Sequence, residues 1–294
     1  MGSRRVAPLA AILAVLALAL ALGQGWFSSS DGSTSAMPFI GSDVRKQTAV
    51  WAVGDGPDGR PAAASVARMI ASAKPDRVLY LGDVYEHGTM AEFKQNFDAV
   101  YRPVAPRIAP TPGNHDWPLH ISGYDPYWRG VHDANVPYYY SFTSGGWQLI
   151  SLNSEMDHGA GSKQIAWLRS HVKGKGTCRI AFWHRPRYSA GVVHGDQRDV
   201  QPFWDALAGN AAIVLTGHEH NMQRFKPRRG ITEFVSGAGG HSHYGLYRRR
   251  DLAFGNASRF GALRLVLAPG SARYKFVATG GKTLDSGVVR CKTG

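Results

Sequence analysis

The stretch RVLYLGD at residues 77–83 sets the pattern of this chain: a short apolar run ends in a glycine, and an acidic residue follows. Apolar, β-branched runs of similar length recur, and we interpret them as strands. They are TAVWAVG (48–54), RVLYLG (77–82), RIAPTPG (107–113), WQLISLN (147–153), CRIAFW (178–183), AAIVLTG (211–217), ITEFVSG (231–237), LRLVLAP (263–269) and YKFVATG (274–280). Helical patterns lie between several of them, at residues 61–73, 90–101, 162–172 and 200–207. Strands and helices that alternate through the first two-thirds predict an α/β fold, and successive strands are predicted for the last third.

Length and composition exclude several classes of protein. The chain has 294 residues, enough for one large domain or two small ones with a real hydrophobic core. Apolar residues make up 44% and charged residues 19%, which excludes a disordered chain, a coiled coil and a collagen-like repeat. The formal charge of +13 leaves three kinds of partner open: nucleic acid, an anionic surface and an anionic substrate.

The N-terminal residues have the form of an export signal. Two arginines precede an almost wholly apolar run at residues 6–23, and this order is typical of a signal peptide. The run is also close to the length of a membrane span, so residues 1–23 are predicted to be either a cleaved signal peptide or a signal anchor. Either alternative makes the rest of the chain secreted or part of the cell envelope. Residues 24–46, rich in Ser and Gly, are expected to be a linker, and residues 47–294 a single domain.

The chain has only two cysteines, Cys178 and Cys291. They are too few for a disulfide-built miniprotein or a multi-cysteine metal module. In an oxidising compartment they could form one disulfide that ties down the C-terminus. The sequence alone does not show that they meet.

Polar side chains follow directly after five of the apolar runs. They are Asp55, then Asp83, then Asn114 with His115 and Asp116, then His184, and then His218 with Glu219 and His220. In an open α/β sheet, sites form beyond the carboxyl ends of the strands, so we expect these groups to gather along one edge. Oxygen and imidazole ligands without a thiolate suit Zn, Mn or Fe. There are too many for one tetrahedral ion, and two ions that share a carboxylate fit better, as in many phosphate-ester hydrolases.

The order of these motifs resembles the calcineurin-like metallophosphoesterases, in particular the purple acid phosphatases and their bacterial relatives. The motifs are GDG (54–56), GDVY (82–85), GNHD (113–116), FWH (182–184) and GHEH (217–220). Further similar stretches are LNSE (152–155), WHRPRYSAGVVHGD (183–196), GHEHNMQRF (217–225) and EFVSGAGG (233–240). The resemblance implies a four-layer αββα sandwich, in which two mixed β-sheets face each other and helices flank them.

The resemblance also implies which residues hold the two metal ions. The first ion would be held by Asp55 and His220, the second by Asn114, His184 and His218, and the bridge between them would be Asp83. The identities of the ions, among Fe, Zn and Mn, stay open.

Three further residues are implied as catalytic or substrate-contacting. His115 would lie outside the metal ligands, where it binds the phosphate or protonates the leaving group, and Asp116 would orient it. His194, ten residues after His184, matches a histidine with which this branch contacts its substrate.

One departure from the family pattern concerns the first ion. The wider superfamily often has a histidine two residues after the first aspartate, where this chain has Pro57. The purple acid branch uses a tyrosine instead, three residues after the bridging aspartate. Here Tyr85 lies two residues after Asp83, and Glu86 occupies the expected place. Either the loop is shifted and Tyr85 is still a ligand, or the tyrosine bond is lost and Glu86 or the residue after it replaces it.

These observations together predict an exported, dinuclear metal-dependent phosphatase that hydrolyses phosphomonoesters by attack of a metal-bound hydroxide. The alternatives are a phosphodiesterase or nuclease with the same metals, and a non-catalytic phosphate-binding envelope protein with a degraded first metal site. The expected partner is a phosphorylated small molecule or polymer. The basic clusters at residues 226–229 and 248–250 lack a nucleic-acid recognition pattern, so we interpret them as solvated loop tips. A membrane would be reached only through an uncleaved N-terminal anchor, and the oligomeric state is not predicted.

Overall fold

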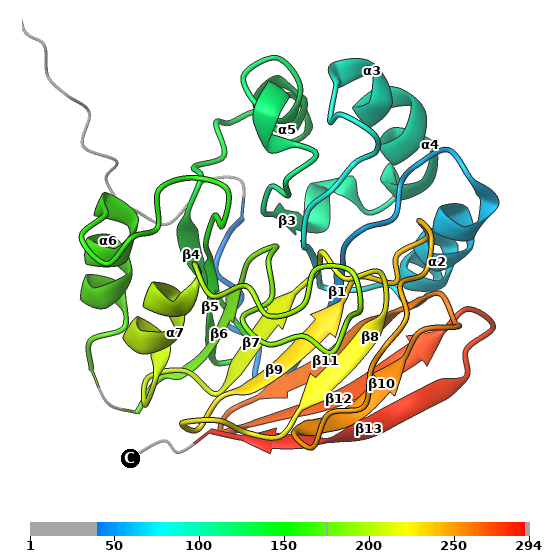
Figure 1. Ribbon diagram of the computed structural model, residues 1–294. Helices are drawn as coiled ribbons and strands as arrows, with labels where there is room; N and C mark the ends of the chain where they lie inside the picture. Colours follow the sequence, from blue (N-terminus) through cyan, green and yellow to red (C-terminus); the bar gives the residue numbers. More distant parts are fainter. Residues whose placement is uncertain (1–39, 175, 292–294) are drawn as a thin grey trace, which may run out of the picture. The chain divides into compact units, whose positions relative to one another are not determined.

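The computed structural model describes residues 40–174 and 176–291, which form two mixed β-sheets (Figure 1). The strands of the first sheet, in spatial order, are β13 (Thr283–Arg290), β12 (Ser271–Ala278), β11 (Gly261–Ala268), β1 (Thr48–Val53), β2 (Arg77–Tyr80) and β3 (Ile108–Pro110). Those of the second are β10 (Leu252–Asn256), β8 (Met222–Phe225), β9 (Thr232–Ser236), β7 (Ile213–Thr216), β6 (Cys178–Phe182), β5 (Trp147–Ser151) and β4 (Tyr140–Ser144). β1, β2 and β3 are mutually parallel, and so are β5, β6, β7 and β9. The other pairs are antiparallel.

The helices lie outside the two sheets. They are α2 (Pro61–Ser72), α3 (Met90–Glu92), the π-helix η1 (Phe93–Phe97), α4 (Asp98–Tyr101), η2 (Ala105–Arg107), η3 (Trp117–Leu119), α5 (Tyr124–His132), α6 (Lys163–His171) and α7 (Gln201–Leu207). One apolar cluster contains residues of both sheets, and a second joins the first sheet to α2, η1, α4 and α5. A third joins the second sheet to α6 and α7. The order of layers is therefore helix, sheet, sheet, helix, and the predicted four-layer sandwich is confirmed.

α2 shows how the sequence produces one of these outer helices. Pro61 stands at its first turn, where the missing N–H costs nothing because no carbonyl precedes it in the helix. The buried residues Ala63, Val66, Ala67 and Ile70 follow the spacing of one helix face. That face packs on the first sheet.

Several elements were not predicted by the apolar pattern. β8, β10 and β13 carry polar residues within short runs, and β4 is half polar, so none of them stands out as a continuous apolar strand. α5 lies in the aromatic-rich insert after the GNHD motif. Its residues Tyr124, Tyr127 and Trp128 are buried and pack on Phe93, so these rings belong to the core.

A disulfide between Cys178 and Cys291 joins the two sheets, with Cα atoms 5.5 Å apart. Cys178 begins β6 in the second sheet, and Cys291 directly follows β13, the edge strand of the first. The bond spans 113 residues, and closing so long a loop stabilises a fold by about 4–5 kcal/mol in the simplest chain-entropy account. It holds the last strand in place, as the sequence suggested.

The predicted export segment, residues 1–23, and most of the predicted linker lie outside the described residues. Within the part of the linker that is described, Ile40 is buried and packs in the cluster between the sheets. Among the residues described, no helix is long and apolar enough to cross a membrane. The predicted division of the chain at residues 23 and 46 stays a prediction.

Candidate metal centre

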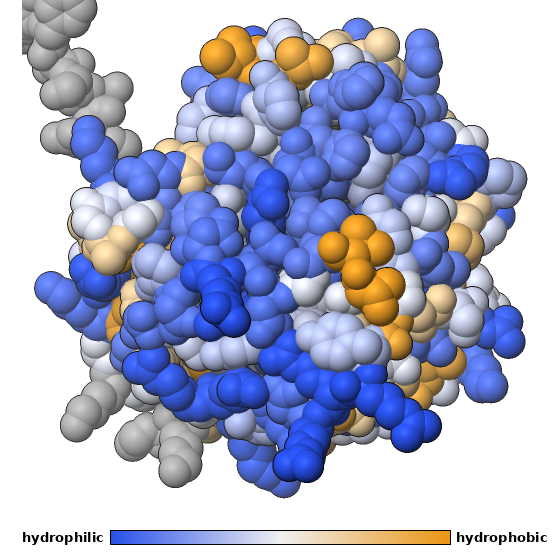
Figure 2. Space-filling model, viewed as in Figure 1, coloured by the Kyte–Doolittle hydropathy of each residue, from blue (hydrophilic) through white to orange (hydrophobic). Residues whose placement is uncertain are grey.

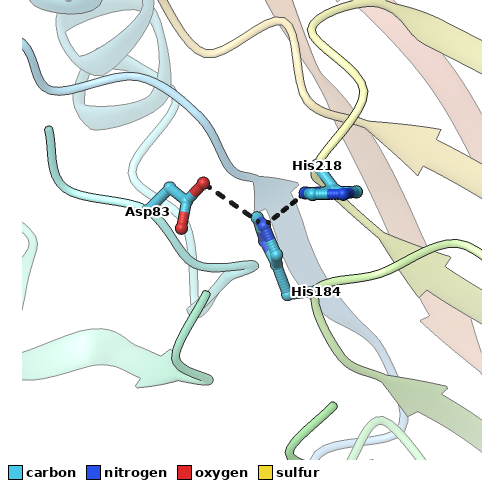
Figure 3. A group of neighbouring side chains, drawn as sticks. All are labelled: Asp83, His184 and His218. Atoms are coloured by element: carbon cyan, nitrogen blue, oxygen red, sulfur yellow. Dashed lines mark hydrogen bonds and ion pairs between the residues drawn. The ribbon is translucent and has the colours of Figure 1, made fainter. Parts of the chain in front are cut away.

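Three candidate ligands, Asp83, Asn114 and His218, lie around Nε2 of a fourth, His184, and Figure 3 shows Asp83, His184 and His218 of this group. It lies 3.0 Å from Asn114 Oδ1, 3.1 Å from His218 Nδ1 and 3.3 Å from Asp83 Oδ2. Each residue is close behind the end of a strand: Asp83 after β2, Asn114 after β3, His184 after β6 and His218 after β7. The two sheets therefore meet here through their strand ends, and the side chains predicted for the second ion lie together.

The chemistry of this second cluster fits a cation. His184 Nδ1 donates to the carbonyl of Leu81 at 2.7 Å, so Nε2 of the neutral ring carries only a lone pair. That lone pair faces a carboxylate oxygen, an amide oxygen and a second imidazole nitrogen. Without a metal ion a proton must supply the positive charge: burial acts against it, but the Asp83 carboxylate raises the pKa of His184 to about 10. A metal ion would satisfy all four donors at once.

The candidate ligands of the first ion lie around the hydroxyl oxygen of Tyr85. This oxygen is 2.9 Å from His220 Nε2, and 3.2 Å from both Asp55 Oδ1 and Asp83 Oδ2. Asp55 Oδ1 and His220 Nε2 lie 3.7 Å apart. Burial raises the pKa of Asp55 well above its ordinary value, so this carboxylate needs a nearby cation to stay ionised.

Tyr85 therefore lies at the first cluster despite its shifted position in the sequence. Its backbone N–H donates to the carbonyl of Pro57 at 3.0 Å, and its own carbonyl accepts from the Asn96 side chain at 2.8 Å. Glu86, one residue on, is exposed, and its backbone N–H donates to Glu92. The loop thus compensates for the one-residue shift of Tyr85. Pro57, which stands where the wider superfamily often has a histidine, helps to hold the tyrosine in place.

The carboxylate of Asp83 belongs to both clusters. Its Oδ2 lies 3.3 Å from His184 Nε2 and 3.2 Å from the Tyr85 hydroxyl. This is the position that a bridging ligand must occupy. The two histidines His218 and His220, on either side of it, have pKa values lowered chiefly by burial, that of His220 to about 3. They stay neutral, which is the form that binds metal.

The backbone takes an unusual conformation at three of these residues. Asp55, Asp83 and His218 have φ angles of 60°, 69° and 68°, in the left-handed region that disfavours residues other than glycine. Such strain clusters at functional sites, where the surrounding structure maintains it. The neighbouring chain must also come close: a Cβ on Gly113 would lie 2.0 Å from Asp83 Oδ1, so this glycine is required by the approach of GNHD to the aspartate.

His115 and Asp116 have different surroundings. His115 donates its backbone N–H to Asp83 Oδ1 at 3.0 Å, and its ring lies against that of Tyr85, so it borders both clusters. The buried Asp116 carboxylate instead accepts from the backbone N–H groups of Asp83, Val84 and Gly113, at 2.8–3.0 Å. These contacts join the loops after β2 and β3. The catalytic roles of both residues stay predictions, and the contacts of Asp116 are those of a residue that positions Asp83.

His194 stacks on His218 with ring centroids 3.9 Å apart, so the loop after β6 folds back onto this candidate ligand. Two residues outside the predicted set occupy the equivalent place at the first cluster. Tyr244 stacks on His220 at 3.9 Å, and His241 stacks on Tyr85 at 4.0 Å. Both lie in the glycine-rich GAGGHSHYG segment after β9. An aromatic or imidazole ring among closely spaced glycines was the only signal for them.

The chain belongs to the calcineurin-like phosphoesterase family, because a sequence model of that family matches residues 48–222, more than half of the chain. This confirms the resemblance found in the motifs. The protein is therefore a phosphoric ester hydrolase by family. The family typically binds a dinuclear metal centre, and Asp83, His184 and His218 form a candidate metal site here.

Similar sequences come from two branches of the family. A probable cyclic nucleotide phosphodiesterase of Synechococcus is 29% identical in an alignment of 187 positions, which covers 60% of this chain and 69% of that protein. Purple acid phosphatase 21 of Arabidopsis thaliana is 29% identical in an alignment of 134 positions, which covers 40% of this chain and 31% of that protein. The chain thus spans about a third of the length of the plant relative.

Solved structures share the fold. Purple acid phosphatase PPD1 from yellow lupin superposes with a TM-score of 0.69 at 19% identity, over 87% of this chain and 55% of that one. GAP50, described as the anchor in the inner membrane complex of Plasmodium, superposes with a TM-score of 0.70 at 17% identity, over 84% of this chain and 90% of that one. At these identities the likeness concerns the fold alone.

Proposed function

We propose that this protein hydrolyses phosphomonoesters with the help of two bound metal ions. The observation that carries the proposal is the pair of donor clusters that share Oδ2 of Asp83. Asp55, Tyr85 and His220 would complete the first site, and Asn114, His184 and His218 the second. Two bound cations would neutralise the charge of a phosphate ester and make water a stronger acid.

Residues around the clusters would handle the substrate. His115 donates its Nδ1–H to the carbonyl of Glu86 at 2.5 Å, so in the protonated ring the Nε2–H would bind the phosphate or pass its proton to the leaving group. His194 is exposed although its ring stacks on His218, so it can contact a substrate that reaches the second cluster. Asp116 would act through the backbone, because it positions the loop that carries Asp83.

The test compares two ester classes with the full chain after metal removal and reconstitution with Zn, Mn or Fe. We expect p-nitrophenyl phosphate to be hydrolysed faster than bis(p-nitrophenyl) phosphate, and a chelator to abolish the activity. A strong preference for the bis-ester would replace this proposal with the second candidate, a phosphodiesterase. That candidate is favoured by the similarity to the Synechococcus protein, whose name describes it as a probable cyclic nucleotide phosphodiesterase.

The non-catalytic alternative depended on a degraded first site. The position of Tyr85 beside Asp55 and His220 argues against such degradation. Elemental analysis tests the point directly: two ions per chain support the hydrolase. One ion or none, with phosphate binding but no turnover, would support the binding protein.

We further propose that the protein acts outside the cytoplasm, because of the signal-like residues 1–23, and that its positive charge attracts phosphorylated substrates. The mature N-terminus, determined on protein from the native host, tests the first part. Activity toward a charged ester should fall as salt is added, because salt screens the attraction between exposed charges. An activity independent of salt would contradict the second part.

A further inference from the structure

The loop at residues 187–195, which carries His194, is held along its backbone by three buried side chains, one in the segment between β7 and β8 and two in strands of the second sheet. Glu219 lies between the ligands His218 and His220 and is fully buried. Its Oε1 accepts from the backbone N–H groups of His194 at 3.1 Å and Gly195 at 2.7 Å, and from the Ser189 hydroxyl at 3.1 Å. The residue between the two metal-ligand histidines thus fixes the position of His194.

Two more buried acceptors hold the first half of the same loop. Glu233 in β9 accepts from the backbone N–H groups of Arg187 at 2.9 Å and Tyr188 at 3.0 Å. Gln223 in β8 accepts from that of Ala190 at 2.7 Å. Carboxylates are rarely buried in this way without a partner, and here their partners are the amides of one loop. The loop conformation is therefore built into the second sheet.

Gly191 shows how closely the loop is fitted. A Cβ at this position would lie 2.0 Å from the Glu219 carboxylate. Only glycine allows the chain to pass over that carboxylate.

At its tip this fixed loop presents two apolar side chains to solvent. Val192 is 60% exposed and Val193 is 52% exposed. The face of the molecule drawn in Figure 2 is mostly hydrophilic, with few apolar patches. The backbone N–H of Val192 donates to the carbonyl of Gly245 at 3.1 Å. Val193 is followed by His194, which stacks on His218, and Gly245 is preceded by Tyr244, which stacks on His220. The valine pair is thus bounded by the two rings that cover the metal ligands.

We propose that Val192 and Val193 form an apolar surface that contacts the leaving group. The site would then select phosphate esters whose leaving group is aromatic or apolar. The inference depends on the proposed function and adds its substrate class. A β-branched side chain has few rotamers, and the loop that carries the valines is fixed in place. Their apolar surface is therefore available to a ligand without reorganisation. A phosphate held at the metal centre would place a bulky leaving group against this surface, whereas a small polar alcohol would gain nothing from it.

The experiment uses the metal-loaded full chain and its Val192→Ser/Val193→Ser variant. Binding of phenylphosphonate and methylphosphonate is measured by calorimetry, and kcat/KM is measured for p-nitrophenyl phosphate and glycerol phosphate. We expect the variant to lose roughly tenfold for the aromatic member of each pair and to change little for the small one. Comparing variant with wild type for each compound removes the intrinsic reactivity of the ester.

The matched control is Val288→Ser in β13, which removes a valine that is 49% exposed on the first sheet. It should leave all four values unchanged. Equal losses for aromatic and small compounds, or no loss for either, would overturn the inference. If the wild type hydrolyses neither ester, the proposed function fails, but the two phosphonates still decide whether the valines contact an aromatic group.

A second variant tests whether the loop must be held. Glu219→Gln keeps an acceptor oxygen for His194 and Gly195, whereas Glu219→Ala removes it. We expect Glu219→Ala to raise KM for p-nitrophenyl phosphate more than it lowers kcat, and Glu219→Gln to restore much of the loss. Identical behaviour of the two variants would show that the loop does not depend on this acceptor.

Discussion

The two donor clusters share Asp83, but they differ in how their atoms are fixed. In the second cluster Asn114, His184 and His218 all follow strand ends, and His184 is further held by the carbonyl of Leu81. In the first cluster the central atom is the hydroxyl of Tyr85, which comes from a loop and is held through Pro57 and Asn96. The sheets thus position the second site, whereas a local loop completes the first. We therefore expect the second ion to bind more tightly.

The largest effect should come from the residue that the clusters share. Asp83→Asn preserves the shape of the side chain but removes the charge that would hold both proposed ions. We expect kcat/KM to fall by roughly a thousandfold or more, and metal content to fall below one ion per chain. Elemental analysis and ester hydrolysis measure the two effects. Retention of two ions would show that Asp83 is no bridge.

Breaking the second cluster alone should separate the two sites. In His184→Asn the ligands of the first cluster remain, so we expect one ion per chain. Activity should fall by more than about a hundredfold, because a lost ligand matters more than a lost outer partner. Circular dichroism serves as the control for folding, since His184 is fully buried. Two ions in this variant would mean that the clusters are not independent sites.

A smaller effect is expected from the first cluster. Tyr85→Phe removes one donor but leaves Asp55 and His220, so the affinity for the first ion should fall by about ten- to a hundredfold. Excess metal should restore much of the activity. With iron bound, any visible absorption band should disappear in this variant. An unchanged metal affinity would exclude the tyrosine as a ligand.

The smallest expected effect concerns a histidine away from both clusters. It separates unfolding at low pH from loss of the metal ions at low pH. Burial lowers the pKa of His132 from 6.5 to about 4, so between these values the unfolded chain takes up a proton that the folded chain does not. Stability is therefore lost as pH falls through this range, by about 1–2 kcal/mol once partial exposure is discounted. His132→Phe should flatten the stability curve between pH 6.5 and pH 4, as followed by urea unfolding, while metal content stays unchanged. A variant whose stability falls as steeply as that of the wild type would contradict this assignment.

Most of the site could be predicted from the sequence because parallel strands end at a common edge. Asp55, Asp83 and His184 follow apolar runs directly, so the fold alone brings them together. Tyr85 could not be decided in this way, since a loop obeys no fixed period and its path depends on contacts with Pro57 and Asn96. The place of Tyr244 was hidden for the same reason, because its segment is rich in glycine.

The strands, too, could be predicted where the sequence pattern is regular and not where it is irregular. Runs such as CRIAFW, apolar except for Arg179, are buried on both faces because the other sheet and helices cover them, and the strands predicted from them are present. The four residues of β8, MQRF, alternate less clearly, and no apolar pattern marks them. The meeting of Cys178 and Cys291, which lie 113 residues apart, depends on how the two sheets pack against each other, so it required the structure.

The left-handed backbone at Asp55, Asp83 and His218 places activity and thermal resistance in competition. A glycine at any of these positions would relieve backbone strain of the order of 1 kcal/mol, while it would remove a candidate ligand. Selection for heat resistance alone would therefore tend to erode the metal centre, because inactive variants need not be unstable. At these three positions the side chain that would bind metal and the backbone conformation that would be most stable call for different residues.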